Sequence, residues 1–204
     1  GEYMEMYGRI RAAIPQAAVS SDCIVGYCGE TDAEFQATLD LVKTAGFKNS
    51  FIFKYSPRPG TKAHERLADD VPEEVKKERH RLLLEAQEDV SLAGNRRFVG
   101  TRQQVLVEGL SVRDEKRRAA AEPDATPHLT GRTMCDRIVV FDAPLRLVGR
   151  IVDVDIVSAA AWSLTGVVAD GLADAVPLDG LRFAAETPPL YQIATSLPGR
   201  AAGG

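Results

Sequence analysis

The residues best suited to bind a ligand follow a predicted strand in the first third of the chain. Residues 49–61 read NSFIFKYSPRPGT, and the aromatic and β-branched residues at their start favour a strand. Pro57 and Pro59 end it, because each proline removes a backbone donor and fixes φ. The bend that results carries a hydroxyl, the guanidinium of Arg58 and a glycine at the carboxyl end of a strand, where α/β proteins bind ligands. An ordinary proline turn is the alternative interpretation.

A second candidate loop, at residues 26–31 (GYCGET), follows the apolar run CIV at residues 23–25. A run without alternation is typical of a strand that is buried on both faces in a parallel sheet. Thr31 and Glu34 have the spacing of a capping box, and Gly46 is a suitable stop, so a helix is predicted between them. Strand, helix and strand in about 35 residues form a βαβ unit, which implies a parallel sheet.

The second half of the chain is predicted to be β-rich. Two helices precede it, at residues 3–14 and 72–92, the latter with Asp70 as its cap and Pro72 in its first helical position. Short strands are predicted at residues 104–108, 137–141, 147–157 and 164–169. Four or five such strands indicate a small β-barrel of the oligonucleotide-binding type, with Trp162 in its core. The fold class is therefore α/β followed by all-β.

Two segments lack a clear periodic pattern. The charged, alanine-rich insert at residues 112–127 predicts a mobile loop. Beyond residue 170 the chain has prolines and glycines with little periodicity, which predicts a poorly ordered tail.

Basic residues are concentrated in the middle of a chain whose net charge is −4. Residues 94–150 contain 11 basic and 7 acidic side chains, and all the basic ones except Lys116 are arginines. The planar guanidinium suits phosphate and stacks on bases. A basic block in an acidic chain indicates a polyanionic partner, RNA above all. A solvated charged face is the alternative.

Cysteine usage and hydropathy indicate the setting. The three cysteines are too few and too scattered for a disulfide framework, which favours a reducing, cytoplasmic setting. No run approaches the roughly 18 apolar residues that span a bilayer, so we expect no membrane partner. The first residues do not resemble a signal peptide, and without an initiating Met we expect the chain to begin within a longer protein.

Four motifs together resemble the radical S-adenosylmethionine (SAM) methylthiotransferases, and among them the MiaB type that modifies tRNA. Three lie in the α/β part, at residues 21–31 (SDCIVGYCGET), 55–61 (YSPRPGT) and 70–79 (DVPEEVKKER). The fourth joins residues 105–109 (VLVEG), 131–133 (GRT) and 137–141 (RIVVF). They occur in the family's order and spacing, so the resemblance extends from residue 1 to about residue 169.

The resemblance implies three regions. Residues 1–93 would be the C-terminal portion of a radical SAM α/β (TIM-like) barrel, residues 94–170 an OB-like TRAM RNA-binding β-barrel, and residues 171–204 the tail. The family's C-x3-C-x2-C cluster motif is absent, because Cys23 and Cys28 have a different spacing and no third partner. We therefore expect no catalytic residue and no metal ligand in this chain. SAM and two 4Fe-4S clusters would be cofactors of the full-length protein, with the cluster ligands outside this chain.

The resemblance also assigns binding residues. Asp22, Gly26, Glu30 and Tyr55 would bind SAM, since a glycine lets the backbone approach a ligand and a carboxylate accepts from ribose hydroxyls. For Glu30 the alternative is helix capping, for Tyr55 a place in the core, and for Asp22 the end of a strand. Contacts with tRNA phosphates are expected from six arginines, which are Arg58, Arg96, Arg97, Arg102, Arg132 and Arg137. For Arg58 a structural role in the bend is the alternative.

The implied function is transfer of a methylthio group to an isopentenyl-modified adenosine next to the anticodon, by radical SAM chemistry. The partners would be the anticodon stem-loop of tRNA and the missing upstream part of the same protein, which we expect to be a monomer at full length. Two alternatives stay open. One is a free-standing TRAM-type RNA-binding module. The other is a related methylthiotransferase that acts on threonylcarbamoyladenosine in tRNA or on a ribosomal protein, although the basic block favours RNA.

Overall fold

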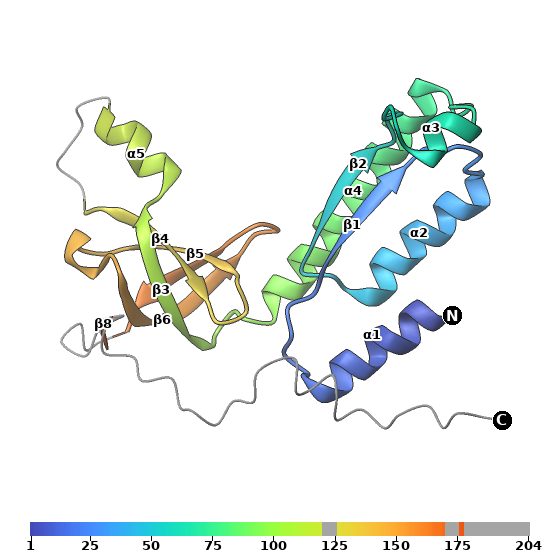
Figure 1. Ribbon diagram of the computed structural model, residues 1–204. Coiled ribbons are helices and arrows are strands. Elements are labelled where there is room, and N and C mark those ends of the chain that lie inside the picture. Colours follow the sequence, from blue (N-terminus) through green and yellow to red (C-terminus); the bar gives the residue numbers. More distant parts are fainter. Residues whose placement is uncertain (120–125, 170–175, 178–204) are drawn as a thin grey trace.

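A long helix joins two differently built halves of the chain (Figure 1). The computed structural model describes residues 1–119, 126–169 and 176–177. The first half is an α/β unit and the second is a β-barrel. This order confirms that a small β-barrel follows the α/β part of the chain. In the described part of the chain, no helix is long and apolar enough to cross a membrane.

The α/β unit contains the predicted βαβ arrangement. Strands β1 (Ser20–Val25) and β2 (Asn49–Lys54) pair in parallel, with Ser20 opposite Asn49 and Val25 opposite Lys54. Helix α2 (Asp32–Ala45) connects them and begins with the predicted capping box. The hydroxyl of Thr31 accepts a hydrogen bond from the Glu34 amide at 3.3 Å, while the Glu34 carboxylate accepts one from the Thr31 amide at 2.8 Å. Helix α1 (Glu2–Ala13) precedes β1.

The two faces of this sheet differ in burial. Helices α2 and α4 pack on the face that contains Val25 and Ile52, and they form one core with Phe47 and Leu83. The opposite face exposes large apolar side chains: Ile24, Phe51 and Phe53 are 56%, 55% and 54% exposed. Burial on both faces of the first strand was predicted, and in this chain it is wrong. Within the described residues, nothing covers the second face.

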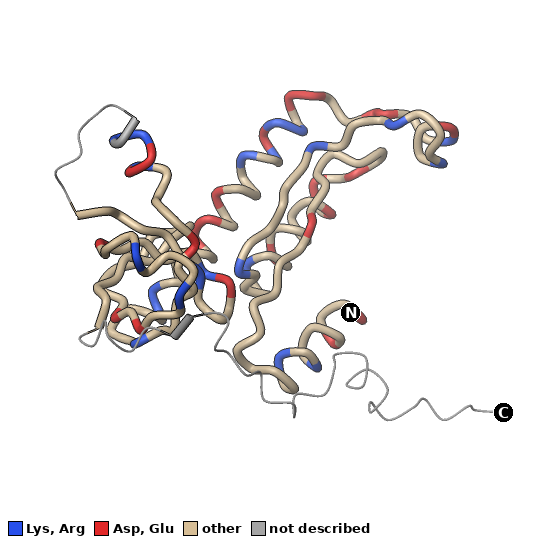
Figure 2. The backbone as a smooth tube through the Cα atoms, turned by 60° about the vertical axis from the view of Figure 1, so that its left-hand side comes forward, with Lys and Arg blue, Asp and Glu red and all other residues tan. Residues whose placement is uncertain are grey.

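Helix α4 (Glu73–Arg96) is 24 residues long and continues from the α/β unit to the β-barrel. Acidic and basic residues alternate along its length (Figure 2). Pro72 is its N-cap residue rather than its first helical residue, and Asp70 does not cap it. The Asp70 carboxylate accepts a hydrogen bond from the Gly29 amide at 2.7 Å instead. A short helix, α3 (Lys62–Arg66), was not predicted, although the hydroxyl of Thr61 caps it.

The β-barrel has five strands that close on themselves. They are β3 (Arg102–Leu110), β4 (His128–Thr133), β5 (Ile138–Asp142), β6 (Arg150–Ala159) and β7 (Leu164–Val168). The pairing runs β3–β4–β5–β7–β6 and returns to β3, and every pair is antiparallel except β5–β7. A two-residue strand, β8 (Val176–Pro177), adds to β6. Closure removes the sheet edges and encloses an apolar core that includes Val105, Leu129, Phe141 and Val154.

Three details of the barrel region differ from the sequence predictions. Strand β4 was not predicted, and Trp162 is 51% exposed rather than in the core. The insert begins with helix α5 (Val112–Ala119), because the Ser111 hydroxyl accepts from the Asp114 amide at 3.2 Å and starts a helical turn. Residues 120–125 of the predicted loop and nearly all of the predicted tail lie outside the described residues.

Candidate functional site

The two loops singled out in the sequence lie side by side. The Tyr55 amide donates a hydrogen bond to the Val25 carbonyl at 2.8 Å, which extends the parallel ladder past both strand ends. Beyond it, the rings of Tyr27 and Tyr55 meet edge to face, with their centroids 5.1 Å apart. Register therefore places the segment around Gly26 next to the segment around Tyr55. We call Gly26, Tyr27, Tyr55 and Lys76 the strand-end cluster.

Lys76 is a member of this cluster that sequence reasoning missed. Its side chain is buried, forms an ion pair with Asp69 at 2.5 Å and places Nζ 5.3 Å from the centre of the Tyr55 ring. Gly26 has φ +71°, and a Cβ there would lie 2.3 Å from Cγ of Lys76. Glycine is therefore required here for two reasons: the positive φ, and the lack of space for a Cβ beside the Lys76 side chain. Lys76 lies three residues before Arg79 and seven before Leu83, both buried, and this helical spacing is the sequence signal that could have found it.

Glu30 is held by the protein itself. Its Oε2 accepts hydrogen bonds from the Gly26 amide at 2.6 Å and from Arg79 Nη1 at 2.8 Å. The side chains of Glu30 and Arg79 are only 10% and 7% exposed. Arg79 also donates to Asp32 at 2.7 Å. Glu30 thus fixes the loop that contains Gly26, whereas the residue that caps α2 is Thr31.

The other predicted cofactor residues are placed as follows. The hydrogen bond with Cys28, followed by desolvation, raises the pKa of Tyr55 to about 12, so its hydroxyl stays neutral at physiological pH. Its ring is therefore a surface for contact rather than a base. Asp22 lies on the exposed face of β1, directly opposite Phe51 in the register. Arg58 is exposed in the bend after β2.

The remaining predicted arginines fall into two groups. Arg102 forms a two-point ion pair with Asp155, at 2.7 and 2.8 Å, and Arg132 bridges Glu108 and Asp136 at 3.0 and 2.6 Å. A phosphate would have to compete with these carboxylates. Arg137 instead has neutral partners, since it hydrogen-bonds to Asn95 and lies 4.6 Å over the Phe98 ring. Arg96 and Arg97 are exposed at the end of α4.

Polar contacts fix the barrel against the α/β unit. Lys48, which precedes β2, forms an ion pair with Asp136 in the turn between β4 and β5. Asp136 also binds Arg132 and has φ 58°. At the end of α4, the side-chain nitrogen Nδ2 of Asn95 donates to the backbone carbonyls of Ala160 and Ala161 at 2.7 and 3.0 Å. The two halves are therefore connected by charge and hydrogen bonds as well as by the helix.

The variant Asp136→Asn should show a small loss of stability that depends on pH. Hydrogen bonds from Lys48 and then Arg132 lower the pKa of Asp136 below its ordinary value of 3.8. The carboxylate therefore contributes fully above that pH, and its contribution is lost as the pH falls through the folded-state pKa. Asn tolerates φ > 0, so the substitution removes mainly the charge.

We expect the variant to be less stable than the wild type by less than about 1 kcal/mol at pH 7, because the Asp136 side chain is 59% exposed. The difference should shrink below pH 4 in urea unfolding curves recorded from pH 7 to pH 3. A difference that stays constant over this range would show that the charge of Asp136 plays no part.

The residues present do not fit an iron–sulfur cluster. No group of three or more His, Cys, Asp or Glu side chains that could hold a metal ion occurs among the described residues. Cys23, Cys28 and Cys135 are all free thiols, and burial raises the pKa of Cys23. A cluster needs several thiolates at one point. The described residues therefore offer no set of ligands for such a cluster.

Comparison with known protein families identifies the β-barrel. Residues 96–169 match the TRAM domain family, so the barrel is a TRAM domain. The chain is also 48% identical to the protein named tRNA-2-methylthio-N(6)-dimethylallyladenosine synthase from Rhodopirellula baltica, in an alignment that covers 81% of this chain and 34% of that protein.

Proteins of the same name show similar agreement. The one from Moorella thermoacetica is 41% identical over 83% of this chain and 35% of its own length. The one from Bordetella avium is 44% identical over 82% of this chain and 33% of its own length. The resemblance to the MiaB-type methylthiotransferases is therefore confirmed. The chain spans about one third of the length of the relatives it matches.

Proposed function

We propose that this chain is the C-terminal part of a radical SAM methylthiotransferase that adds a methylthio group to an isopentenyl-modified adenosine next to the anticodon of tRNA. One observation carries the proposal. The 48% identity to the tRNA-2-methylthio-N(6)-dimethylallyladenosine synthase of Rhodopirellula baltica extends through the α/β unit as well as the TRAM domain. A free-standing RNA-binding module would give no reason for the α/β half to match these enzymes.

The first half would be the end of an incomplete α/β barrel. The exposed apolar face of β1 and β2 supports this, because strands of such barrels are covered by helices on one face and by the barrel interior on the other. Further strands from upstream would bury Ile24, Phe51 and Phe53. We accordingly propose the divisions 1–93, 94–170 and 171–204, with the first boundary inside α4.

The strand-end cluster, together with Asp22 on the exposed face of β1, would form one side of the SAM site. An exposed aromatic and apolar surface at the carboxyl ends of β1 and β2 fits an adenosine, and Tyr55 offers a ring that cannot ionise near neutral pH. Glu30 would act by positioning Gly26 rather than by binding a ribose, since both its buried contacts are already internal. When bound, SAM would supply the adenosyl radical, and the 4Fe-4S clusters would be held by residues outside this chain.

The TRAM domain would bind the anticodon stem-loop through phosphate contacts. Of the six predicted arginines, Arg96, Arg97 and Arg137 are the strongest candidates, because their positive charges face no carboxylate in the described part of the chain. Arg102 and Arg132 would have to exchange an ion pair, and Arg58 lies near the strand-end cluster rather than on the TRAM domain. We propose that the full-length protein acts as a monomer in the cytoplasm.

Nucleoside analysis of tRNA tests the proposed function. In cells lacking the full gene, 2-methylthio-N6-isopentenyladenosine should disappear and N6-isopentenyladenosine should accumulate in its place. Restoring the gene should restore the modified base. Loss of a methylthio group from threonylcarbamoyladenosine instead would move the assignment to the related enzyme, and unchanged tRNA would reject a tRNA substrate altogether.

A further inference from the structure

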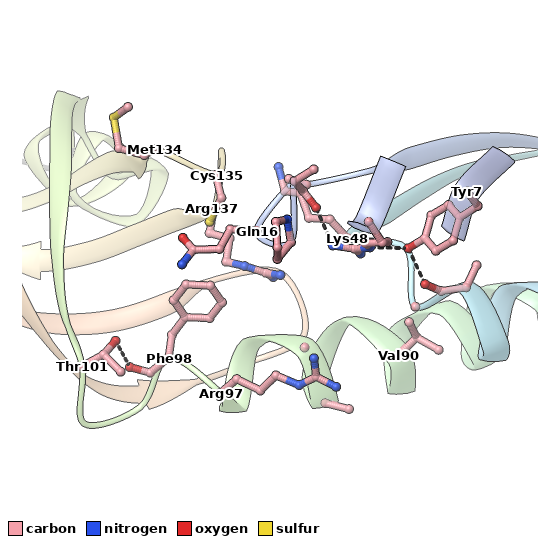
Figure 3. A pocket seen from close by; sticks show the side chains of 18 of the residues that line it. Tyr7, Gln16, Lys48, Val90, Arg97, Phe98, Thr101, Met134, Cys135 and Arg137 are labelled. Atoms are coloured by element: carbon pink, nitrogen blue, oxygen red, sulfur yellow. Dashed lines mark hydrogen bonds between the residues drawn. The ribbon is translucent and has the colours of Figure 1, made fainter. Parts of the chain in front are cut away.

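A cavity of about 760 Å³ lies between the α/β unit and the TRAM domain (Figure 3). Its lining comes from the end of α1, residues 15–18, the end of α2, the last turns of α4 and the turn before β5. Lys48, just ahead of β2, is part of this lining. The cavity is therefore at the amino ends of the two parallel strands, opposite to the strand-end cluster, and it is separate from the proposed cofactor site.

The cavity is lined by cations and by no acidic residue. Neither Asp nor Glu is among the lining residues. The lining contains five lysines and arginines, which are Arg11, Lys43, Lys48, Arg97 and Arg137. Lys48 pairs with Asp136. The other four form no ion pair in the part of the chain that the structure describes. Arg11 donates only to neutral acceptors, the Tyr7 hydroxyl at 2.9 Å and the Ala17 carbonyl at 2.6 Å.

Arg137 shows that this concentration of charge is costly in the unbound protein. Burial lowers the pKa of Arg137, and the nearby charges of Arg97 and Arg11 lower it further. In addition, Nε of Arg137 is buried without a hydrogen-bond partner among the described residues. A buried donor without an acceptor is unfavourable. An anion in the cavity would offset the repulsion between the guanidiniums.

We propose that this cavity binds phosphodiester groups of the tRNA backbone, as a second contact region that joins the two halves of the chain. The inference rests on the proposed function and names a site within it. Its cations come from both halves, because Arg11 and Lys43 belong to the α/β unit, Arg137 to the TRAM domain and Arg97 to the end of the helix between them. A bound backbone would thus be held by both units at once.

The chemistry of the lining favours a nucleic-acid backbone over a small nucleotide. Small-molecule sites are predominantly apolar and aromatic, whereas here the Phe98 ring is covered by Arg137 and the Tyr7 hydroxyl is engaged with Ala45 and Arg11. No carboxylate lines the cavity to accept from a ribose hydroxyl. Guanidinium and ammonium groups without base-reading partners position phosphates and read no sequence.

Charge reversal at two exposed lining residues tests the inference. The double variant Lys43→Glu/Arg97→Glu should fold, since both side chains are at the surface. Binding of unmodified tRNA to the purified full chain would be measured at several salt concentrations. We expect the affinity to fall at least tenfold and the slope of log K against log salt to decrease in magnitude by about 2, one for each lost phosphate contact.

A matched double variant, Arg66→Glu/Arg146→Glu, carries the same charge change at exposed positions outside the cavity. It should keep the wild-type slope. If the cavity variant binds tRNA with wild-type affinity and slope, the inference is overturned while the proposed function stands. If the wild-type chain itself does not bind tRNA, the RNA-binding role of the TRAM domain fails first.

Inorganic phosphate distinguishes a free anion from the RNA backbone. Phosphate at matched ionic strength should weaken tRNA binding by the wild type more than chloride does, and this difference should be absent in the cavity variant. Phosphate binding that the cavity variant abolishes, combined with unchanged tRNA affinity, would identify a small-anion site and contradict the proposed RNA contact.

Discussion

Replacing Arg79 by alanine is expected to destabilise the α/β unit by about 3 kcal/mol, because it leaves a buried carboxylate without its partner. Arg79 donates to Glu30 and Asp32 and lies 5.5 Å over the Phe35 ring. The Glu30 side chain is only 10% exposed, so water cannot replace the guanidinium freely. Since Glu30 also accepts from the Gly26 amide, the loop beside Tyr55 should loosen as well.

Urea unfolding of the full chain would measure the loss, and Arg81→Ala is the matched control. Arg81 is on the same helix and also binds two carboxylates, those of Glu78 and Glu85, but all three side chains are largely exposed. Its removal should have little effect. If the two variants lose similar stability, burial of the Arg79 ion pair is not what holds the loop.

Substituting Gly131 by alanine should be nearly as damaging to the TRAM domain, with an expected loss of about 2–3 kcal/mol. Gly131 lies opposite Val107 in the pairing of β4 with β3. A Cβ there would lie 2.4 Å from the Leu106 carbonyl oxygen and 2.6 Å from a methyl group of Val105. Because the first of these contacts is backbone, the two strands must separate to admit the methyl group, and the closed barrel resists that.

Gly109→Ala serves as the comparison for Gly131→Ala. Gly109 is in β3, next to the same strand pair, but a Cβ there would meet nothing within 4 Å. Thermal unfolding followed by circular dichroism should show a melting temperature lowered by roughly 10 °C for the Gly131 variant and little change for the Gly109 variant. Equal melting temperatures for both would mean that β4 can shift away from β3 without cost.

The local structure of the α/β unit was largely predictable, because its signals are local. Thr31, Glu34 and Gly46 defined both ends of α2, and the strands expected at the run 23–25 and at the start of residues 49–61 are β1 and β2. The burial of β1 was not predictable from this chain. The run CIV is typical of a strand covered on both faces, and in this chain only one face is covered. The hydropathy of β1 therefore fits a sheet that is covered on both faces, whereas one face of this sheet is exposed.

Interactions between distant residues account for what the sequence did not reveal. Glu30 and Arg79 are 49 positions apart, so neither the spacing nor the composition could show that the predicted ribose acceptor is held by a buried arginine. Strand β4 was missed because it is short and contains Gly131, a residue of weak strand propensity, so its pairing with β3 and β5 is what stabilises it. The five cations of the cavity are spread from Arg11 to Arg137, so no single motif contains them.

Helix α4 runs unbroken from the sheet to the barrel, so its length determines the distance and the rotation between the two halves. A helix advances about 1.5 Å and turns about 100° with each residue. Because Asn95 anchors its last turn to the chain around Ala160, the barrel must follow the helix. One residue inserted midway would swing the barrel about a quarter turn and carry Arg137 away from Arg11. The length of this helix, rather than any single contact along it, therefore sets how the two halves face each other.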